Sequence, residues 1–174
     1  LDGTKEFLRQ DGQGAFTVNI ALIEQGRPVL GIVYAPALGR LFHTCDGASA
    51  REVSAGATRA LAVRPVPPEG AVGVASHSHR DAATDDWLAA HGITETISIS
   101  SSLKFCLLAA GEADVYPRFG PTMEWDTAAG DAVLRVAGGN VQTPAGDKFT
   151  YGKPDYRNEA FVAFGGFSPI TASA

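Results

Sequence analysis

Hydrophobic and polar residues alternate regularly over the first third of the chain. Apolar residues take every second position of 15–23, a spacing that predicts a β-strand with these side chains on one face. They are Phe16, Val18, Ile20 and Leu22. A Gln25-Gly26-Arg27 turn and an Asp46-Gly47 hairpin signal separate the runs that follow. Further strands are predicted at residues 29–34, 40–44, 48–53 and 60–63, so this part of the chain predicts an antiparallel meander.

Strand and helix patterns alternate in the second half of the chain. Strands are predicted at residues 72–75, 94–99, 114–116 and 160–164, helices at 81–91 and 101–110, and a hairpin at 141–151. Three prolines and a glycine between residues 64 and 70 interrupt both patterns, which favours a lobe boundary there. We therefore expect residues 1–66 to form a lobe made almost entirely of strands and residues 67–174 to form an α/β lobe.

A helix beginning at Thr127 is the element around which the second lobe is organised. Its apolar positions recur with helical spacing, and Gly138-Gly139 ends it. Those positions are Ala128, Ala132, Val133, Val136 and Ala137. Asp126 immediately precedes the helix, where its side chain can cap the free N–H groups of the first turn. The small residues at 128–130 would allow another backbone, or a ligand, to approach that turn closely.

The composition indicates a globular protein and argues against a membrane span and a nucleic-acid partner. The 174 residues suffice for one core, or for two small lobes that share one, and 45% hydrophobic with 19% charged residues is typical of a globular protein. No apolar run approaches the roughly 18 to 20 residues of a membrane span. The net charge of −5, without a cluster of Lys and Arg, argues against a nucleic-acid partner. Cys45 and Cys106 lie far apart without a metal-binding spacing, so we expect reduced thiols and a cytoplasmic location.

Polar and charged residues gather in the loops that precede the helices of the second lobe. They are His77, His79 and Arg80 before one helix, Ser101 and Lys104 at the start of the next, and Arg118 on the approach to Asp126. Each has an ordinary alternative as a loop histidine, a surface arginine or a lysine with its amine in water. Asp2-Gly3-Thr4 is likewise either a capped turn or a phosphate seat. Their shared position at loop–helix junctions nevertheless indicates a pocket for a polyanion.

The ordered set of motifs resembles the inositol monophosphatase superfamily of Mg²⁺-dependent, lithium-sensitive phosphatases. Asp2-Gly3-Thr4, and Trp125-Asp126 followed by Ala128-Ala129-Gly130, are similar to its two signature stretches. Within the superfamily, residues 2–7, 101–106 and 116–122 resemble the bacterial CysQ-type 3′(2′),5′-bisphosphate nucleotidases of sulfur assimilation. The resemblance covers essentially the whole chain. It implies an α/β (α+β) fold, a layered αβαβα sandwich of the inositol monophosphatase and fructose-1,6-bisphosphatase type.

The resemblance also implies roles for individual residues. The metal ligands would be the Leu1 carbonyl and the carboxylates of Asp2 and Asp126. Gly3 and Thr4 would hold the scissile phosphate, and the Thr4 hydroxyl would also contact the attacking water, so Asp2, Thr4 and Asp126 form the implied catalytic set. The implied substrate contacts are His79, Ser101, Lys104 and Arg118. Inositol monophosphatases tend to carry an acidic residue at the position of Arg118, where an arginine suits a second phosphate.

The implied reaction is the hydrolysis of adenosine 3′,5′-bisphosphate to AMP and phosphate with two or three Mg²⁺ ions in the complete enzyme. Mg²⁺ prefers carboxylate oxygens, and such ions can lower the pKa of a bound water and neutralise the leaving oxygen. The implied partner is thus a small nucleotide bisphosphate. A monomer or a homodimer, and a peripheral association with the inner membrane, stay open. So do two other functions, an inositol or sugar monophosphatase of the same fold and a non-catalytic phospho-ligand-binding module.

The chain departs from the family pattern at its start. The first family motif begins with Asp-Pro, and a glutamate ligand lies further upstream, whereas this sequence begins at Leu1. We therefore expect an N-terminally truncated piece that lacks the N-terminal helices and first strands, with apolar surface exposed on one face of the first sheet. Because Asp2 and Asp126 alone cannot hold two divalent cations, we expect the isolated chain to be inactive or nearly so without the missing N-terminal segment.

Overall fold

The first five strands form one antiparallel sheet. The computed structural model describes residues 2–3, 7–8, 15–76, 81–99 and 102–169. The strands β1 (Val18–Glu24), β2 (Arg27–Ala35), β3 (Arg40–Cys45), β4 (Ser49–Ser54) and β5 (Ala57–Ala60) pair in chain order, with a short 3-10 helix η1 (Pro36–Leu38) between β2 and β3. The predicted meander is therefore confirmed.

The last strand of this meander lies earlier than predicted. The predicted strand covers residues 60–63, whereas β5 ends at Ala60. Ala55 and Gly56 both have positive φ, 49° and 78°, the geometry of a tight two-residue hairpin turn. The chain therefore reverses directly after β4, and Val63 leaves the sheet to donate its N–H to the carbonyl of Ala137.

The second sheet is mixed. Its strands are β6 (Val72–Ala75), β7 (Glu95–Ser98), β8 (Val115–Arg118), β10 (Asn140–Gln142) and β12 (Phe161–Phe164), in the order β10-β12-β8-β6-β7. β6 runs parallel to β7 and β8, whereas β12 is antiparallel to β8 and β10. Two very short strands that the sequence analysis missed, β9 (Thr122–Met123) and β11 (Arg157–Asn158), pair with each other. In the described chain, the hairpin predicted at 141–151 is reduced to β10 and one bridge between Gln142 and Lys148.

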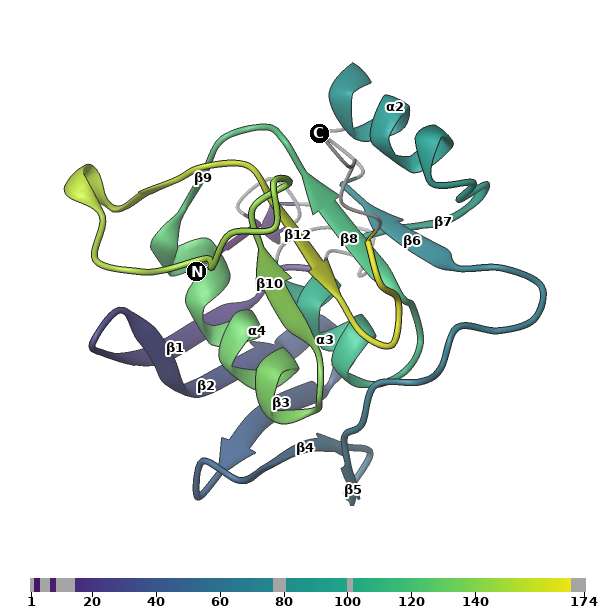
Figure 1. Cartoon of the computed structure of the whole chain (residues 1–174). Coiled ribbons are helices and arrows are strands. Elements are labelled where there is room, and N and C mark those ends of the chain that lie inside the picture. Colours follow the sequence, from purple (N-terminus) through teal and green to yellow (C-terminus); the bar gives the residue numbers. More distant parts are fainter. Residues whose placement is uncertain (1, 4–6, 9–14, 77–80, 100–101, 170–174) are drawn as a thin grey trace.

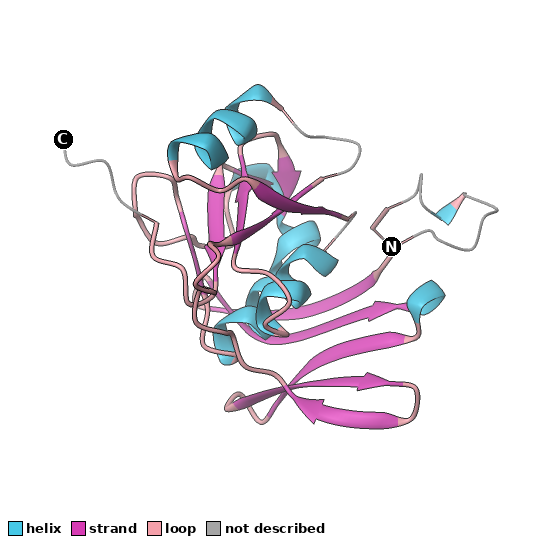
Figure 2. Ribbon diagram, turned by 90° about the vertical axis from the view of Figure 1, so that its right-hand side faces the viewer, coloured by secondary structure: helices cyan, strands magenta, loops and turns pink. Residues whose placement is uncertain are grey.

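The helices and sheets are stacked in layers (Figure 1). α3 (Leu103–Ala109) and α4 (Glu124–Val136) lie between the two sheets, and α2 (Ala82–Ala90) lies beyond the second one, as Figure 2 shows from the side. A 3-10 helix, η2 (Pro154–Tyr156), precedes β11. This layered α+β arrangement confirms the predicted fold class. No helix in the described part of the chain is long and apolar enough to cross a membrane.

Helix α4 starts one turn earlier than predicted, which corrects the assignment of Asp126. The helix begins at Glu124 after an extended Met123, so Asp126 is its third residue and not the residue before it. The Asp126 carboxylate still serves the helix terminus, because its Oδ2 accepts the Met123 N–H at 2.9 Å. The sequence contained two acidic residues near this point, and the local pattern did not decide which of them opened the helix.

Close backbone approaches fix α4 between the sheets. A methyl group added at Gly31 of β2 would lie 2.2 Å from the carbonyl oxygen of Ala129, and one added at Gly130 would lie 2.7 Å from Phe105. The prediction that small residues in this turn admit another backbone is therefore confirmed. The buried hydrophobic cluster includes Phe42 from the first sheet and Phe161 from the second. The two lobes thus share one core, and their division near residue 66 stays a prediction.

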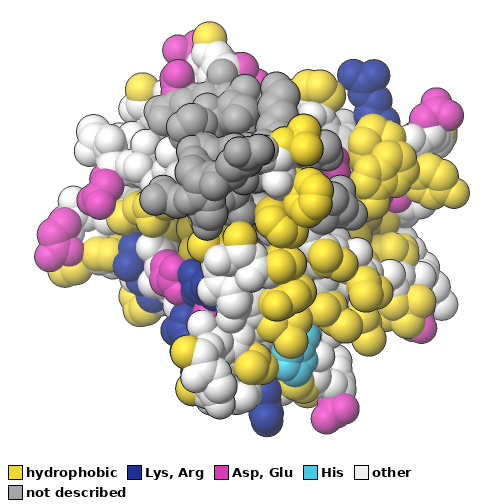
Figure 3. Space-filling view, turned by 180° about the vertical axis from the view of Figure 1, so that it is seen from behind, with side chains coloured by type: hydrophobic (Ala, Val, Ile, Leu, Met, Phe, Trp, Pro, Cys, Tyr) yellow, Lys and Arg dark blue, Asp and Glu magenta, His cyan; other side chains and the backbone are white. Residues whose placement is uncertain are grey.

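The outer face of the first sheet is apolar and open. Five apolar side chains at alternating positions of β1 and β2 are 38–56% exposed. They are Val18, Ile20, Leu22, Leu30 and Tyr34. Hydrophobic side chains accordingly gather on the face of the molecule shown in Figure 3. The apolar surface expected on one face of this sheet is present.

Candidate active site

The beginning of helix α3 holds the carboxylate of Asp2. The backbone of Asp2 pairs with Thr17, whose N–H and carbonyl lie 2.9 Å and 2.8 Å from their Asp2 partners. The backbone N–H of Ser102, just before α3, donates to Oδ2 of Asp2 at 2.9 Å although the two residues are 100 positions apart. A carboxylate at this position also interacts favourably with the partial positive charge of a helix start. Asp2 is therefore anchored by both sheet and helix.

A small buried polar cluster, made of Thr17, Asn19 and Ser102, lies beside this anchor. The Ser102 hydroxyl donates to Oδ1 of Asn19 at 2.7 Å and lies 2.9 Å from Oγ1 of Thr17. Ser102 itself is only 2% exposed. These three residues are not among the site residues predicted from the sequence. The available signal was that Thr17 and Asn19 are polar positions of a strand whose face points into the protein.

Asp2 and Asp126 lie in one electrostatic neighbourhood. Burial raises the pKa of Asp2 above its ordinary value, and the negative charge of Asp126 raises it further. The charge of Lys104 and the hydrogen bonds from Ser102 and Gly3 act in the opposite direction. The fold therefore brings two carboxylates and one ammonium group together from three distant segments. Two like charges held near one another favour a cation between them.

Lys104 is buried, which removes one of its two interpretations. It is 4% exposed, its Nζ lies 3.4 Å from the carbonyl oxygen of Ile99, and the same atom lies 5.2 Å from the centre of the Tyr116 ring. A lysine whose amine reaches bulk water along the surface would not have this burial. The aromatic ring stabilises the ammonium group at a place where water is scarce. Lys104 thus provides a positive charge beside Asp2.

Arg118 ends strand β8 and is held by the turn that follows. Its Nε donates to the carbonyl oxygen of Gly120 at 3.2 Å, and its Nη2 donates to that of Pro121 at 3.3 Å. A guanidinium group is planar and carries five N–H donors, so these two hydrogen bonds fix the orientation of its plane. A fixed guanidinium group is well suited to a phosphate or a carboxylate.

Several of the predicted site residues lie outside the described residues. They are Leu1, Thr4, His77, His79, Arg80 and Ser101. Among the residues that are described, no three His, Cys, Asp or Glu side chains come together as possible metal ligands. Asp2 and Asp126 fit Mg²⁺ in kind, since it binds carboxylate oxygens, but two carboxylates are fewer ligands than a closed site would need. The metal-ligand roles of Asp2 and Asp126 therefore stay a prediction.

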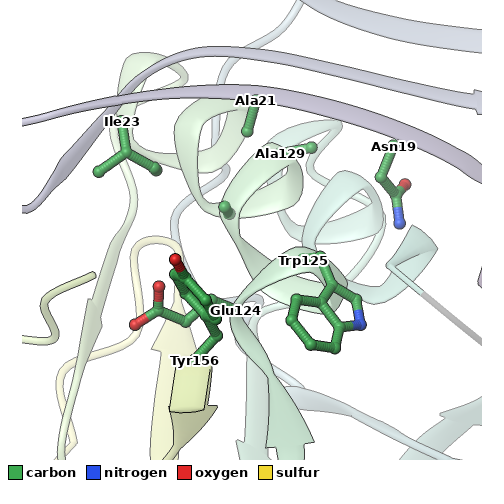
Figure 4. A pocket seen from close by; sticks show the side chains of 8 residues that line it. Asn19, Ala21, Ile23, Glu124, Trp125, Ala129 and Tyr156 are labelled. Carbon is green, nitrogen blue, oxygen red and sulfur yellow. The ribbon is translucent and has the colours of Figure 1, made fainter. Parts of the chain in front are cut away.

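A pocket lies between strand β1 and the start of α4, and Asn19 of the polar cluster is among its lining residues. It has a volume of about 250 Å³, and strand β1 forms one wall with Asn19, Ala21 and Ile23 while Trp125 and Tyr156 face it (Figure 4). The nearby Glu124 carboxylate is engaged by the N–H groups of Gly152 and Lys153 at 2.9 Å each. None of Asp2, Lys104, Arg118 or Asp126 lines this pocket, and Asn19 connects it to the cluster beside Asp2.

The fold and the charged site define a known class of layered α+β sandwich. A solved structure of CysQ from Bacteroides thetaiotaomicron, a bacterial member of the inositol monophosphatase family, superposes with a TM-score of 0.83 at 37% identity, covering 97% of this chain and 68% of that one. An inositol monophosphatase from Thermotoga maritima shares the fold at 23% identity, with a TM-score of 0.73 over 95% of this chain and 61% of that one.

The family follows from the sequence comparisons. The model of the inositol monophosphatase family matches residues 1–163, and the chain belongs to that family. Two curated relatives, each named 3′(2′),5′-bisphosphate nucleotidase CysQ, come from Salmonella typhimurium and Escherichia coli and are 48% and 47% identical over 151 residues. Both alignments cover 87% of this chain and 59% of the relative. The chain thus spans about three fifths of the length of these relatives.

Proposed function

We propose that this chain is part of a Mg²⁺-dependent 3′(2′),5′-bisphosphate nucleotidase that converts adenosine 3′,5′-bisphosphate into AMP and phosphate. The observation that carries the proposal is the convergence of Asp2, Lys104 and Asp126 from distant segments into one charged neighbourhood. The names of the curated relatives from Salmonella typhimurium and Escherichia coli support the same substrate.

The proposed roles follow the chemistry of the side chains. Asp2 and Asp126 would provide carboxylate oxygens to Mg²⁺, together with the Leu1 carbonyl. When bound, the metal supplies a Lewis acid and an activated water. Gly3 and Thr4 would hold the scissile phosphate through their N–H groups, and Thr4 would orient the attacking water through its hydroxyl. The Ser102 N–H donates a hydrogen bond to the Asp2 carboxylate and so fixes its orientation before a ligand binds.

The remaining polar residues would bind the rest of the substrate. Lys104 provides a buried positive charge that can neutralise a phosphate oxygen, since desolvated charges interact strongly. Arg118, fixed by two backbone carbonyls, would bind the second phosphate of a bisphosphate nucleotide. His79 and Ser101 complete the proposed contacts. An acidic side chain at the position of Arg118 would instead suit the hydroxyl groups of a sugar.

The cellular location and the oligomeric state of the protein are part of the same proposal. We place it in the cytoplasm as a monomer or homodimer, and the two free thiols of Cys45 and Cys106 are consistent with a reducing compartment. Two or three Mg²⁺ ions would need further ligands, because the carboxylates of Asp2 and Asp126 cannot complete the coordination of that many ions. The relatives are longer than the chain, so we expect its activity to depend on additional protein segments.

The test is phosphate release by the complete encoded protein with and without Mg²⁺. We expect adenosine 3′,5′-bisphosphate to be the preferred substrate and chelation of Mg²⁺ to abolish turnover. The competing function is an inositol or sugar monophosphatase of the same fold. Preferred turnover of inositol 1-phosphate over the bisphosphate would refute the nucleotidase assignment and favour that alternative.

A further inference from the structure

The carboxylate of Asp81 joins two structural elements next to Arg118. Asp81 is the N-cap of α2, and its Oδ1 accepts the N–H of Thr84 at 2.8 Å. Its second oxygen lies against the turn after β8, because a methyl group built on Gly120 would be 3.1 Å from Oδ2 of Asp81. The cap oxygen and the turn-facing oxygen are therefore different atoms of one carboxylate.

The same turn carries the contacts that hold Arg118. The guanidinium group donates to the carbonyl oxygens of Gly120 and Pro121, at 3.2 Å and 3.3 Å. A methyl group on Gly120 would also lie 3.5 Å from Cζ and Nη2 of Arg118. The Asp81 carboxylate and the Arg118 guanidinium therefore both lie close to Gly120. A larger residue would push the two charged groups apart.

Hydrogen bonds and charge favour the ionised form of Asp81. Burial raises the pKa of this carboxyl, but hydrogen bonds from Thr84, the charge of Arg118 and a backbone hydrogen bond from Gly120 together lower it below its ordinary value. One oxygen of this carboxylate therefore accepts from the helix start while the other faces the Gly120 turn. An ordinary helix cap would need only the hydrogen bond to the helix start.

We propose that Asp81 is a positioning residue that fixes the Gly120 turn and thereby aims the Arg118 guanidinium at the second phosphate of the substrate. The inference rests on the proposed function. It assigns to Asp81 a role in selecting bisphosphates over monophosphates, because only a bisphosphate has a group for Arg118 to bind. Asp81 itself does not touch the substrate in this account, and its negative charge makes it unsuited to do so.

The test is steady-state kinetics of Asp81→Asn in the complete encoded protein. Asn caps helices as well as Asp does, so the variant should keep its melting temperature. Asn has one side-chain oxygen, so it cannot cap Thr84 and also place a charged oxygen against the Gly120 turn. We expect the KM for adenosine 3′,5′-bisphosphate to rise about tenfold, the size expected for a weakened charged hydrogen bond, while kcat stays within about twofold. The KM for adenosine 3′-monophosphate, which lacks the second phosphate, should stay within about twofold.

Two further variants separate positioning from general effects. Gly120→Ala should give the same loss of selectivity through steric displacement, without changing any charge. Asp86→Asn removes a charge from an exposed position of the same helix and should behave as wild type. An Asp81→Asn variant with unchanged kinetics, or with the same increase in KM for the bisphosphate and the monophosphate, would overturn this inference and leave the proposed function standing. A wild-type protein that does not turn over the bisphosphate would overturn the proposed function and this inference with it.

Discussion

The backbone N–H of Ser102 donates a hydrogen bond to Oδ2 of Asp2 at 2.9 Å, across 100 positions of sequence. This contact ties the charged site to the interface between the first sheet and α3. The Ser102 side chain is bonded in turn to Asn19 and Thr17 of the strand region that pairs with Asp2. The position of a predicted metal ligand thus depends on a buried polar cluster and not only on its own loop.

Removal of the Ser102 hydroxyl should destabilise the protein. Ser102→Ala leaves Oδ1 of the half-buried Asn19 without its 2.7 Å donor, which costs about 1 kcal/mol of the free energy of unfolding. Chemical denaturation of the purified protein measures this cost. Ser98→Ala is the matched control, because Ser98 is exposed at the end of β7 and its loss should change stability by less than about 0.5 kcal/mol. Equal effects of the two variants would contradict the importance of the buried cluster.

A side chain at Gly31 should disrupt the packing of α4 on the first sheet. The added methyl group of Gly31→Ala would lie 2.2 Å from the Ala129 carbonyl oxygen, so helix and sheet must separate, at a cost of about 3 kcal/mol or more. Gly39→Ala provides the comparison. Gly39 has open space around it but a φ of 60°, so only backbone strain of about 1 kcal/mol is expected. If Gly31→Ala lowered the free energy of unfolding in denaturant titrations no more than Gly39→Ala, the close contact between β2 and α4 would be contradicted.

The ion pairs of Glu52 should make stability depend on pH. Burial raises the pKa of Glu52, but hydrogen bonds and charges from Arg40 and Arg59 outweigh it and lower the pKa below its ordinary 4.5. A lowered folded-state pKa means that the stabilisation is present above the unfolded-state pKa and is lost as pH falls through the folded-state value. Glu52→Gln should therefore cost about 2–4 kcal/mol at pH 7 and progressively less below pH 4.5.

The control for this prediction is Glu159→Gln, at an exposed position. It should leave the unfolding free energy within about 0.5 kcal/mol at both pH values. A difference between wild type and Glu52→Gln that stays constant from pH 7 down to acid conditions would show that the loss is one of packing and not of charge.

Local patterns predicted most of the elements because those elements are determined locally. The alternation of β1 and the Asp46-Gly47 turn placed the meander correctly, since period and turn chemistry are both short-range signals. The pairing of β9 with β11 could not be predicted, because strands of two residues have no measurable period. The start of α4 was also wrong by one turn, because Glu124 and Asp126 are both plausible near a helix start.

The candidate site also contains residues that the sequence predicts and residues that it does not. Asp2, Lys104, Arg118 and Asp126 could be named from motifs, because the motifs preserve residue type and order. The residues that hold these side chains in position could not be predicted from the sequence. Ser102 acts on Asp2 through its backbone N–H, which any residue type but proline possesses, and Asp81 resembles an ordinary helix cap in sequence. Contacts of this kind appear only when distant segments are placed together.

Phosphate release by Asp126→Asn, measured in the complete encoded protein with adenosine 3′,5′-bisphosphate and Mg²⁺, tests the central claim most directly. Asp147→Asn is the matched control, because Asp147 lies exposed in the loop after β10. Our account predicts that Asp126→Asn lowers kcat/KM by at least about a thousandfold through loss of a metal ligand, while Asp147→Asn keeps the wild-type value. An Asp126→Asn protein that releases phosphate at the wild-type rate would contradict a shared metal site at Asp2 and Asp126.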